Sequence, residues 1–256
     1  MRCSFFPKTL YAVALTPALL VPLNAQGNSG FRRWGVEFEA GPYGFTRNDV
    51  RIPGDTGTRF SMLDLNVKGP EGYLRIYGEA NVNRKHGFRV LYAPLQAEDT
   101  GRLSQSTVFA GATFAPGVST TAVYKFNTYR FTYRYTFKDS ERWQLRVGAA
   151  GLVRDAKIEL QQEGRAARKT DLGAVPLAYF SAQYDLTDRA HLLFDFEGLG
   201  APQGRALDGI LKFTYDLTNR WTFGVGYRAL EGGADNDEVY NFSWLHYGAF
   251  SLGYRW

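Results

Sequence analysis

From Trp34 onward, apolar and polar positions alternate with a period of two, which is the spacing of β-strands and not of helices. The clearest run covers residues 129–137, where every odd position is Tyr or Phe and every even position is Arg or Thr. Comparable runs begin near residues 36, 74, 143, 178, 192, 207 and 221. The pattern predicts an all-β chain built from many antiparallel strands.

The segments between these runs are of two kinds. Short polar turns are expected at 83–87, 138–142, 187–190 and 218–220, and long loops at 45–72, 96–119, 159–173, 199–206 and 231–238. Alternating short and long connections predict ten strands, with both chain termini on the short-turn side. Residues 59–66 leave a count of twelve open, because they fit either an extra strand or part of the first long loop.

A strand ladder of this kind fits either a soluble barrel or a membrane barrel, and three features favour the membrane. The runs hold about 9–11 residues, the length of a tilted strand that crosses the hydrocarbon of a bilayer. Aromatic residues gather where strands meet the short turns, which is expected of an interfacial girdle. They are Phe88, Phe137, Trp143, Tyr184, Tyr215, Trp221, Tyr254 and Trp256. Short turns at one end and long loops at the other are the third feature. We therefore expect a transmembrane antiparallel up-and-down β-barrel.

The polar face of each strand should point into the barrel. Shifting residues 129–137 by one position would aim Arg130 and Arg134 at lipid, at about 2–4 kcal/mol for each near the bilayer midplane. The same reasoning predicts an interior network of opposite charges. Its expected members are Glu37, Glu39, Arg75, Glu79, Arg130, Arg134, Arg146, Asp195, Glu197, Asp208, Lys212 and Arg228. Because even eight strands leave an interior that side chains can fill, we expect a narrow, largely filled lumen.

Composition and the first residues indicate where the chain resides. Residues 1–25 have a basic start, a short apolar stretch and a small residue at Ala25, which predicts a secretory signal peptide followed by a single domain over 26–256. Removing 1–25 leaves a net charge of +3 and no cysteine, since the one cysteine is Cys3. So small a charge gives no reason to expect nucleic-acid binding. We also expect no metal site and no cofactor.

The last strand carries a family resemblance. Apolar or aromatic residues stand at Phe250, Leu252, Tyr254 and Trp256, and this spacing with a terminal aromatic resembles the C-terminal assembly signal of Gram-negative outer-membrane β-barrels. Members usually end in Phe, so Trp256 is a departure from the pattern. The resemblance implies an outer-membrane location, recognition by the barrel-assembly machinery and long loops on the extracellular side. It identifies no subfamily.

Three functions are compatible with such a barrel. A charged, filled lumen fits a structural or interaction role, or the passage of very small solutes. The alternative is an outer-membrane hydrolase, for which His246 is the only histidine expected near the long loops, since His86 and His191 belong to the short-turn end. No nucleophile with a base at a recognisable spacing accompanies His246, so we predict no catalytic residues and no enzyme.

The long loops suggest one partner. Arg165, Arg168 and Lys169 could meet the phosphates of lipopolysaccharide, since guanidinium groups match phosphate geometry. The expected partners are therefore outer-membrane lipid, including lipopolysaccharide, and the assembly machinery. We expect the barrel to be a monomer.

Overall fold

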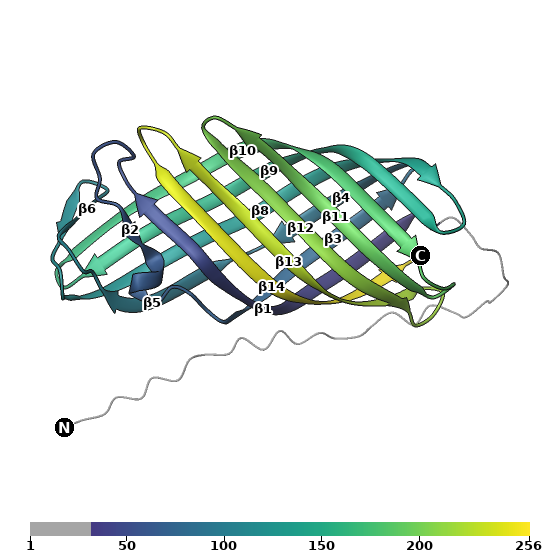
Figure 1. Ribbon diagram of the computed structural model, residues 1–256, viewed down its shortest axis with the longest axis horizontal. Coiled ribbons are helices and arrows are strands. Elements are labelled where there is room, and N and C mark those ends of the chain that lie inside the picture. The colour runs from purple at the N-terminus through teal and green to yellow at the C-terminus, as the bar shows by residue number, and fades with distance from the viewer. Residues whose placement is uncertain (1–31) are drawn as a thin grey trace, which may run out of the picture. The chain divides into compact units, whose positions relative to one another are not determined.

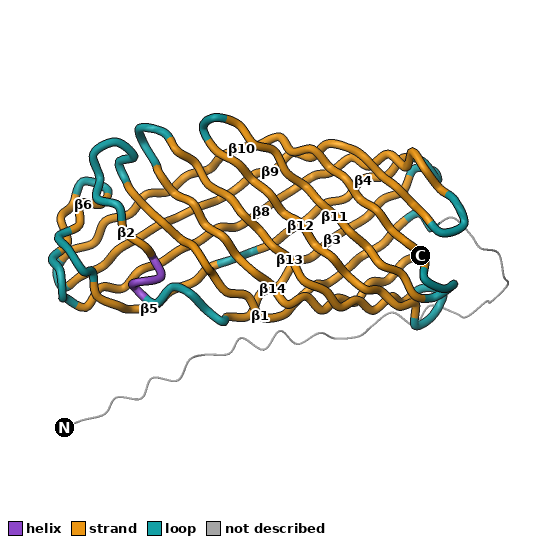
Figure 2. Tube along the Cα trace, in the orientation of Figure 1, coloured by secondary structure: helices purple, strands orange, loops and turns teal. Residues whose placement is uncertain are grey.

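The computed structural model describes residues 32–256, so the predicted signal peptide lies outside the described residues. These residues form a closed barrel of ten antiparallel strands (Figures 1 and 2), which confirms the predicted fold and strand count. The wall consists, in order, of β1 (Trp34–Arg51), β3 (Glu71–Asn81), β4 (His86–Ala93) continued by β5 (Gln96–Arg102), β8 (Ser119–Asp139), β9 (Trp143–Gln162), β10 (Arg165–Asp185), β11 (Ala190–Ala201), β12 (Gly204–Asp216), β13 (Trp221–Asp235) and β14 (Tyr240–Arg255). Within the described residues, no helix has the length and apolar character needed to cross a bilayer.

The barrel closes by pairing its first and last strands. β1 and β14 are hydrogen-bonded from Gly35 opposite Arg255 to Arg51 opposite Tyr240, with one bulge near Thr46. All other wall neighbours follow each other in sequence, so the topology is up-and-down. Residues 59–66 add no strand to the wall, because they form the two-residue β2 (Phe60–Ser61) beside β1 and a 3₁₀ turn, η1 (Met62–Leu65). The count of twelve is therefore wrong.

The short turns lie where they are predicted, but three of the five expected long loops are mostly strand. The ranges 159–173, 199–206 and 231–238 are built largely as extensions of β9–β14, closed by brief turns such as the one at Gly164, whose φ is +70°. Most side chains of these extensions are polar or exposed, although Leu160 is buried in the interior, so the apolar alternation that marks a strand in the bilayer is weak there. The connections over 52–70 and 103–118 are the two that stay long.

The predicted register is confirmed. Phe131 is 54% exposed and its neighbour Arg130 only 6%, so the aromatic face of β8 points out of the barrel and the arginines point in. The aromatic residues at the short-turn end pack against each other on the outer surface, as in the pairs Trp143–Tyr184 and Trp221–Tyr254, each 4.8 Å between ring centroids. The outer surface of the barrel is therefore apolar with a girdle of large rings at one edge.

An apolar plug fills part of the interior at the long-loop end, where the sequence predicts only loops. The plug is supplied by η1, the segment after it and the small hairpin β6 (Thr107–Phe109)–β7 (Ala112–Phe114). Met62, Leu65, Phe109 and Phe114 have no exposed surface and pack with inward-facing wall residues such as Phe45. One signal in the sequence indicates the plug. The ranges predicted as loops contain large apolar side chains, and a loop that carries such residues tends to bury them.

Candidate functional site

A chain of ion pairs crosses the barrel interior at mid-height. Arg228 on β13 binds Glu39 on β1, with Nε and Nη2 each 3.0 Å from a carboxylate oxygen, and it also binds Asp208 on β12. Asp208 is bound as well by Arg75 on β3, at 2.7 Å, and by Arg130 on β8, at 3.1 Å. β8 and β12 stand on opposite sides of the ring of strands, so these contacts tie facing walls together.

The series of ion pairs continues from β8 to β11 and β4. Arg130 binds Glu197 on β11, and Arg89 on β4 lies 3.2 Å from Glu197 and 2.9 Å from Asp195. Four arginines thus face four carboxylates, and no excess charge is left inside this connected set. A buried ion survives in a protein interior only when it is paired and hydrogen-bonded, so the set must form as a unit.

The other predicted interior charges stand nearer the short-turn end. Lys212 pairs with Glu37, and Arg134 pairs with Glu79 at 2.7 Å. Arg146 is hydrogen-bonded to Gln144, and among the described residues no carboxylate lies within ion-pair distance of it. The structure thus brings eleven of the twelve predicted residues into ion pairs and leaves Arg146 beside them.

Sequence reasoning left several polar partners of the network unnamed. The hydroxyl of Tyr77 accepts hydrogen bonds from Arg228, at 2.8 Å, and from Arg75, at 2.9 Å. The hydroxyl of Tyr179 donates to Asp195 at 2.9 Å. The alternation along β3 and β10 places both tyrosines on the inward face, but it does not show which charged groups they meet across the lumen.

The network separates two spaces inside the barrel. A cavity of about 470 Å³ lies toward the long-loop end and reaches Ala206 on β12, and a smaller one of about 130 Å³ lies toward the short-turn end and reaches Lys212. Asp208 faces inward between these two residues and belongs to the ion-pair chain. The larger cavity is within the size range of small-molecule binding sites.

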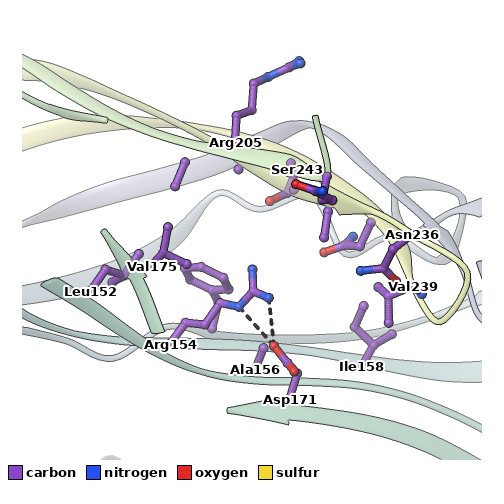
Figure 3. Close-up of a pocket in the computed structure, with 18 of the residues that line it drawn as sticks. Leu152, Arg154, Ala156, Ile158, Asp171, Val175, Arg205, Asn236, Val239 and Ser243 are labelled. Carbon is purple, nitrogen blue, oxygen red and sulfur yellow. Dashed lines mark hydrogen bonds and ion pairs between the residues drawn. The ribbon is translucent and has the colours of Figure 1, made fainter. Parts of the chain in front are cut away.

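The larger cavity is apolar next to the ion-pair network, which we call its bottom, and charged toward the long-loop end, which we call its rim. Leu152, Val175 and Ala206 line it next to the network, and Ile158 and Val239 line it farther out. Arg154 on β9 points into the cavity in Figure 3, where its Nε and Nη2 lie 3.1 and 2.9 Å from Oδ2 of Asp171 on β10. Arg205 points away from the cavity in the same view.

Comparison with solved structures shows what this architecture is similar to. The outer membrane protease OmpT from Escherichia coli superposes with a TM-score of 0.53 at 6% identity, over 88% of this chain and 97% of that one. Neisserial surface protein A gives a TM-score of 0.37 at 12% identity over 87% and 97%, and the attachment invasion locus protein Ail of Yersinia pestis gives 0.35 at 10% over 88% and 99%.

The likeness in fold and the exposed apolar belt on the outer surface point to the same class of protein. The chain has the fold of a Gram-negative outer-membrane β-barrel. No protein-family model and no curated protein matches the sequence, so the likeness concerns the fold alone. The fold is consistent with a place in the cell outer membrane. That the short turns are periplasmic and the long-loop end extracellular stays an expectation from the sequence.

His246 lies on the outer surface of the barrel toward its long-loop end. Its Nε2 is 2.8 Å from the hydroxyl oxygen of Thr46, its Nδ1 is hydrogen-bonded to the hydroxyl of Tyr227, and its ring stacks on Trp244. Both ring nitrogens are therefore engaged by neutral hydroxyls. The ring of His246 thus lies on the outward face of β14, beside the exposed Trp244.

Beyond Trp244, a group of arginines covers two rings of β14; we call this group the arginine shelf. Arg51 and Arg59 lie over the ring of Tyr240, at 5.3 and 4.7 Å from its centroid. Arg47 and Arg205 lie over the ring of Phe242, at 5.4 and 5.1 Å. Such distances are those of cation–π contacts.

Two carboxylates accompany the shelf. Asp49 accepts hydrogen bonds from Arg47, at 2.9 Å, and from Arg59, at 2.8 Å, and Glu231 is bound by Arg205. Burial by itself would raise the pKa of Asp49, but the bonds from Arg59 and Arg47 outweigh it and hold the pKa below its ordinary value. The shelf therefore carries more positive than negative charge at neutral pH.

Three residues of the predicted assembly signal, Phe250, Leu252 and Tyr254, lie on β14, and Trp256 directly follows the strand. Phe250, Leu252 and Trp256 are exposed on the outer surface, and the ring of Tyr254 is tilted against that of Trp221 and stacks on that of Trp256. Their role in assembly stays a prediction.

Proposed function

We propose that this outer-membrane barrel is closed to ion flow and acts through interactions at its extracellular end. The observation that carries the proposal is the ion-pair chain from Glu39 to Asp195, which joins facing walls across the lumen. The apolar plug above it covers a second level of the interior.

The number of strands also supports a closed barrel. Eight strands already give an interior that side chains can fill, whereas porins with open aqueous channels have about 16–18. With ten strands and large side chains such as Arg, Tyr and Phe facing inward, little room is left for a column of water. A narrow route for very small solutes would have to break several ion pairs to open.

Planar-bilayer recording tests this proposal. We expect the purified, folded protein to insert without producing unitary conductance steps at high salt. Folding is checked independently by reduced electrophoretic mobility after boiling compared with an unboiled sample, and insertion by flotation of the protein with lipid vesicles of the same composition. Reproducible single-channel steps from the folded species would contradict the closed barrel and favour passage of small solutes.

At the outer surface we propose lipopolysaccharide as the partner. The arginine shelf faces outward, just beyond the aromatic residues at the lipid boundary, which is the level of the anionic head groups of the outer leaflet. Arginine matches phosphate with paired donors. The stretch that the sequence suggested for this role is partly engaged elsewhere, since Arg165 donates to the carbonyl oxygen of Thr113 and Lys169 pairs with Glu238.

Retention of lipopolysaccharide during purification tests this partner. Exchanging Arg51 and Arg59 together for Gln should lower the amount that co-purifies by several-fold, while the exposed Arg168→Gln variant should retain it. Equal retention by the two would assign the contact to some other surface of the barrel.

The alternative function is hydrolysis at His246, and its surroundings argue for an interfacial role. A general base needs a partner that orients it and a nucleophile or water within reach. The described neighbours of its ring nitrogens are the hydroxyls of Thr46 and Tyr227. Turnover of lipid A or peptide that is present in the parent protein and lost on His246→Asn would favour the hydrolase.

A further inference from the structure

One seam of the barrel wall is open at its extracellular end. β10 pairs with β11 only from Ala178 opposite Gly198 to Asp185 opposite His191. Beyond that point β10 pairs with β9 alone, over Arg165–Leu177, and the end of β11 pairs with β12 alone. The wall therefore divides above Ala178. The edge of β10 is free over Arg165–Leu177, and beside the part of it nearest Ala178 the edge of β11 is free over Leu199–Ala201.

Other seams on the same side of the barrel do not divide in this way. β13 and β14 stay paired up to the turn that joins them, at Asp235 opposite Tyr240, and β8 and β9 stay paired to Thr121 opposite Gln161. The seam between β3 and β4 also ends early, at Ile76 opposite Tyr92, but η1 packs against β1, β5 and β8 on that side and belongs to the apolar plug. The β10–β11 seam instead borders the 470 Å³ cavity.

The two edges carry residues suited to an open seam. Pro176 stands on the free part of β10, and a residue without an N–H is tolerated at the unpaired edge of a sheet. Across the gap, Leu199 on β11 follows the inward-facing Asp195 and Glu197 in the alternation, yet it is 44% exposed because it borders the cavity. The outward-facing Leu172 on β10 is 75% exposed. The seam is thus lined with apolar side chains at the level where the barrel leaves the outer leaflet.

The chemistry of the cavity changes from bottom to rim. Its lower part is apolar, with Leu152, Val175 and Ala206, and Arg154 follows Leu152 by one inward-facing position toward the outside. Asp171 engages Arg154 through the single oxygen Oδ2, at Nε and Nη2. In the part of the chain that the structure describes, the Nη1 donors of Arg154 meet no other side-chain acceptor, so they are free for an anion.

We propose that this cavity binds a single-chain anionic amphiphile, with its carboxylate or phosphate on Arg154 and its hydrocarbon chain against Leu152, Val175 and Leu199, and that the β10–β11 seam connects the cavity sideways to the outer leaflet. The proposal rests on the closed barrel of the preceding section, because an open water-filled lumen would offer no dry wall to a hydrocarbon chain. The free edges of β10 and β11 let such a chain extend between the strands.

Asp171 gives the proposal a directional test. Its carboxylate competes with any anion for Arg154, so Asp171→Asn should strengthen the binding of an anion, whereas Arg154→Gln should weaken it. Loss of a charge-assisted hydrogen bond corresponds to about a tenfold or larger fall in affinity. A purely structural role of the Arg154–Asp171 pair would make both variants change in the same direction.

Equilibrium binding to the protein in phosphatidylcholine nanodiscs measures this directly, with empty nanodiscs as the blank. Labelled dodecanoate and dodecyl phosphate should bind saturably, dodecanol at least tenfold more weakly, and acetate not at all. Dodecanoate against dodecyl phosphate then tells which head group is preferred. Arg154→Gln should weaken the two anions without changing dodecanol, Val175→Trp should abolish all binding by filling the cavity, and the matched control Arg165→Gln on the same hairpin should change nothing.

The position of the chain is tested by photolabelling. Dodecanoate with a diazirine at its terminal carbon should label peptides that contain residues 172–177 and 199–206, and unlabelled dodecanoate should compete. Label confined to residues 52–70 would overturn the seam as the binding place. Heat-shifted mobility of every variant shows that it is folded.

The outcomes separate the two proposals. No saturable binding above the blank, or binding that neither Arg154→Gln nor Val175→Trp alters, overturns the amphiphile site and leaves a silent barrel in planar bilayers unaffected. Channel activity in those bilayers overturns the closed barrel, whatever the binding result.

Discussion

Arg228 and Glu39 form a two-point ion pair inside the barrel, with Nε and Nη2 of the guanidinium each 3.0 Å from a carboxylate oxygen. Glu39 has no exposed surface, and the two residues stand on β1 and β13, which are separated by β14. Because neither charge would be stable alone in this interior, the pair fixes how β1 and β13 sit across β14 at the place where the barrel closes.

Replacing Arg228 by Met should therefore lower the free energy of unfolding by about 3–5 kcal/mol, since Glu39 is left buried without its partner. Urea titration of the protein in lipid vesicles measures the loss. The exposed Arg220→Met variant, at a periplasmic turn, should stay within about 0.5 kcal/mol of the parent. Adding Glu39→Gln to the Arg228 variant should recover part of the loss, and simple additivity of the two substitutions would contradict direct coupling.

The outward face of β8 should reject charge. Phe131→Arg is expected to cost about 2–4 kcal/mol, because it places a guanidinium on the lipid-facing surface. Phe131→Leu keeps an apolar side chain there and is the matched control. Unfolding in the same vesicles gives both values, and a tolerated arginine would argue against lipid contact at this position.

The plug should depend on its buried ring. Phe109→Ala is expected to destabilise the protein by about 3–5 kcal/mol if the plug unfolds together with the barrel, or to expose residues 52–70 and 103–118 to protease if it unfolds alone. Val108 points the opposite way and is 38% exposed, so Val108→Ala should do neither. Limited proteolysis before and after urea distinguishes the two cases, and an unaltered Phe109 variant would refute the plug.

Assembly should depend on the outward residues at the end of β14. Trp256→Ala is expected to reduce the amount of heat-modifiable barrel in the outer membrane while leaving export to the periplasm intact, as the resemblance to the assembly signal implies. Arg255→Ala, next to it on the other face, is the control. Fractionation followed by electrophoresis measures both steps, and normal accumulation of the Trp256 variant would remove the signal assignment.

The fold could be predicted where one face of a strand contacts lipid and needs apolar side chains, while the other faces the interior and accepts charged ones. Residues 129–137 show this best, because a shift of one position would put Arg130 and Arg134 into hydrocarbon. The same demand explains why the interior charges could be named in advance. Their partners could not, since Arg130 meets Glu197 and Asp208 from positions 67 and 78 residues away, and only closure and strand tilt bring them together.

The features that could not be predicted lie where the two faces of a strand do not differ in this way. The extensions of β9 and β10 are largely exposed, so their mostly polar sequence fits a loop as well as a strand. Met62 and Phe109 lie in ranges without periodicity, and their burial becomes evident only once the hairpin turns inward. The open β10–β11 seam is a matter of pairing, and only Pro176 hints at it in the sequence.

The most direct test of the whole account is the environment of two adjacent residues of β8. Cys3 is the only cysteine of the sequence and lies in the predicted signal peptide, so single cysteines at 131 and 132 can each be spin-labelled in the mature protein. In vesicles, we predict that a label at 131 is accessible to oxygen but not to a water-soluble nickel complex, and that a label at 132 is shielded from both. A label at 131 that the nickel complex reaches freely, with the protein soluble in buffer without detergent, would contradict the barrel's orientation.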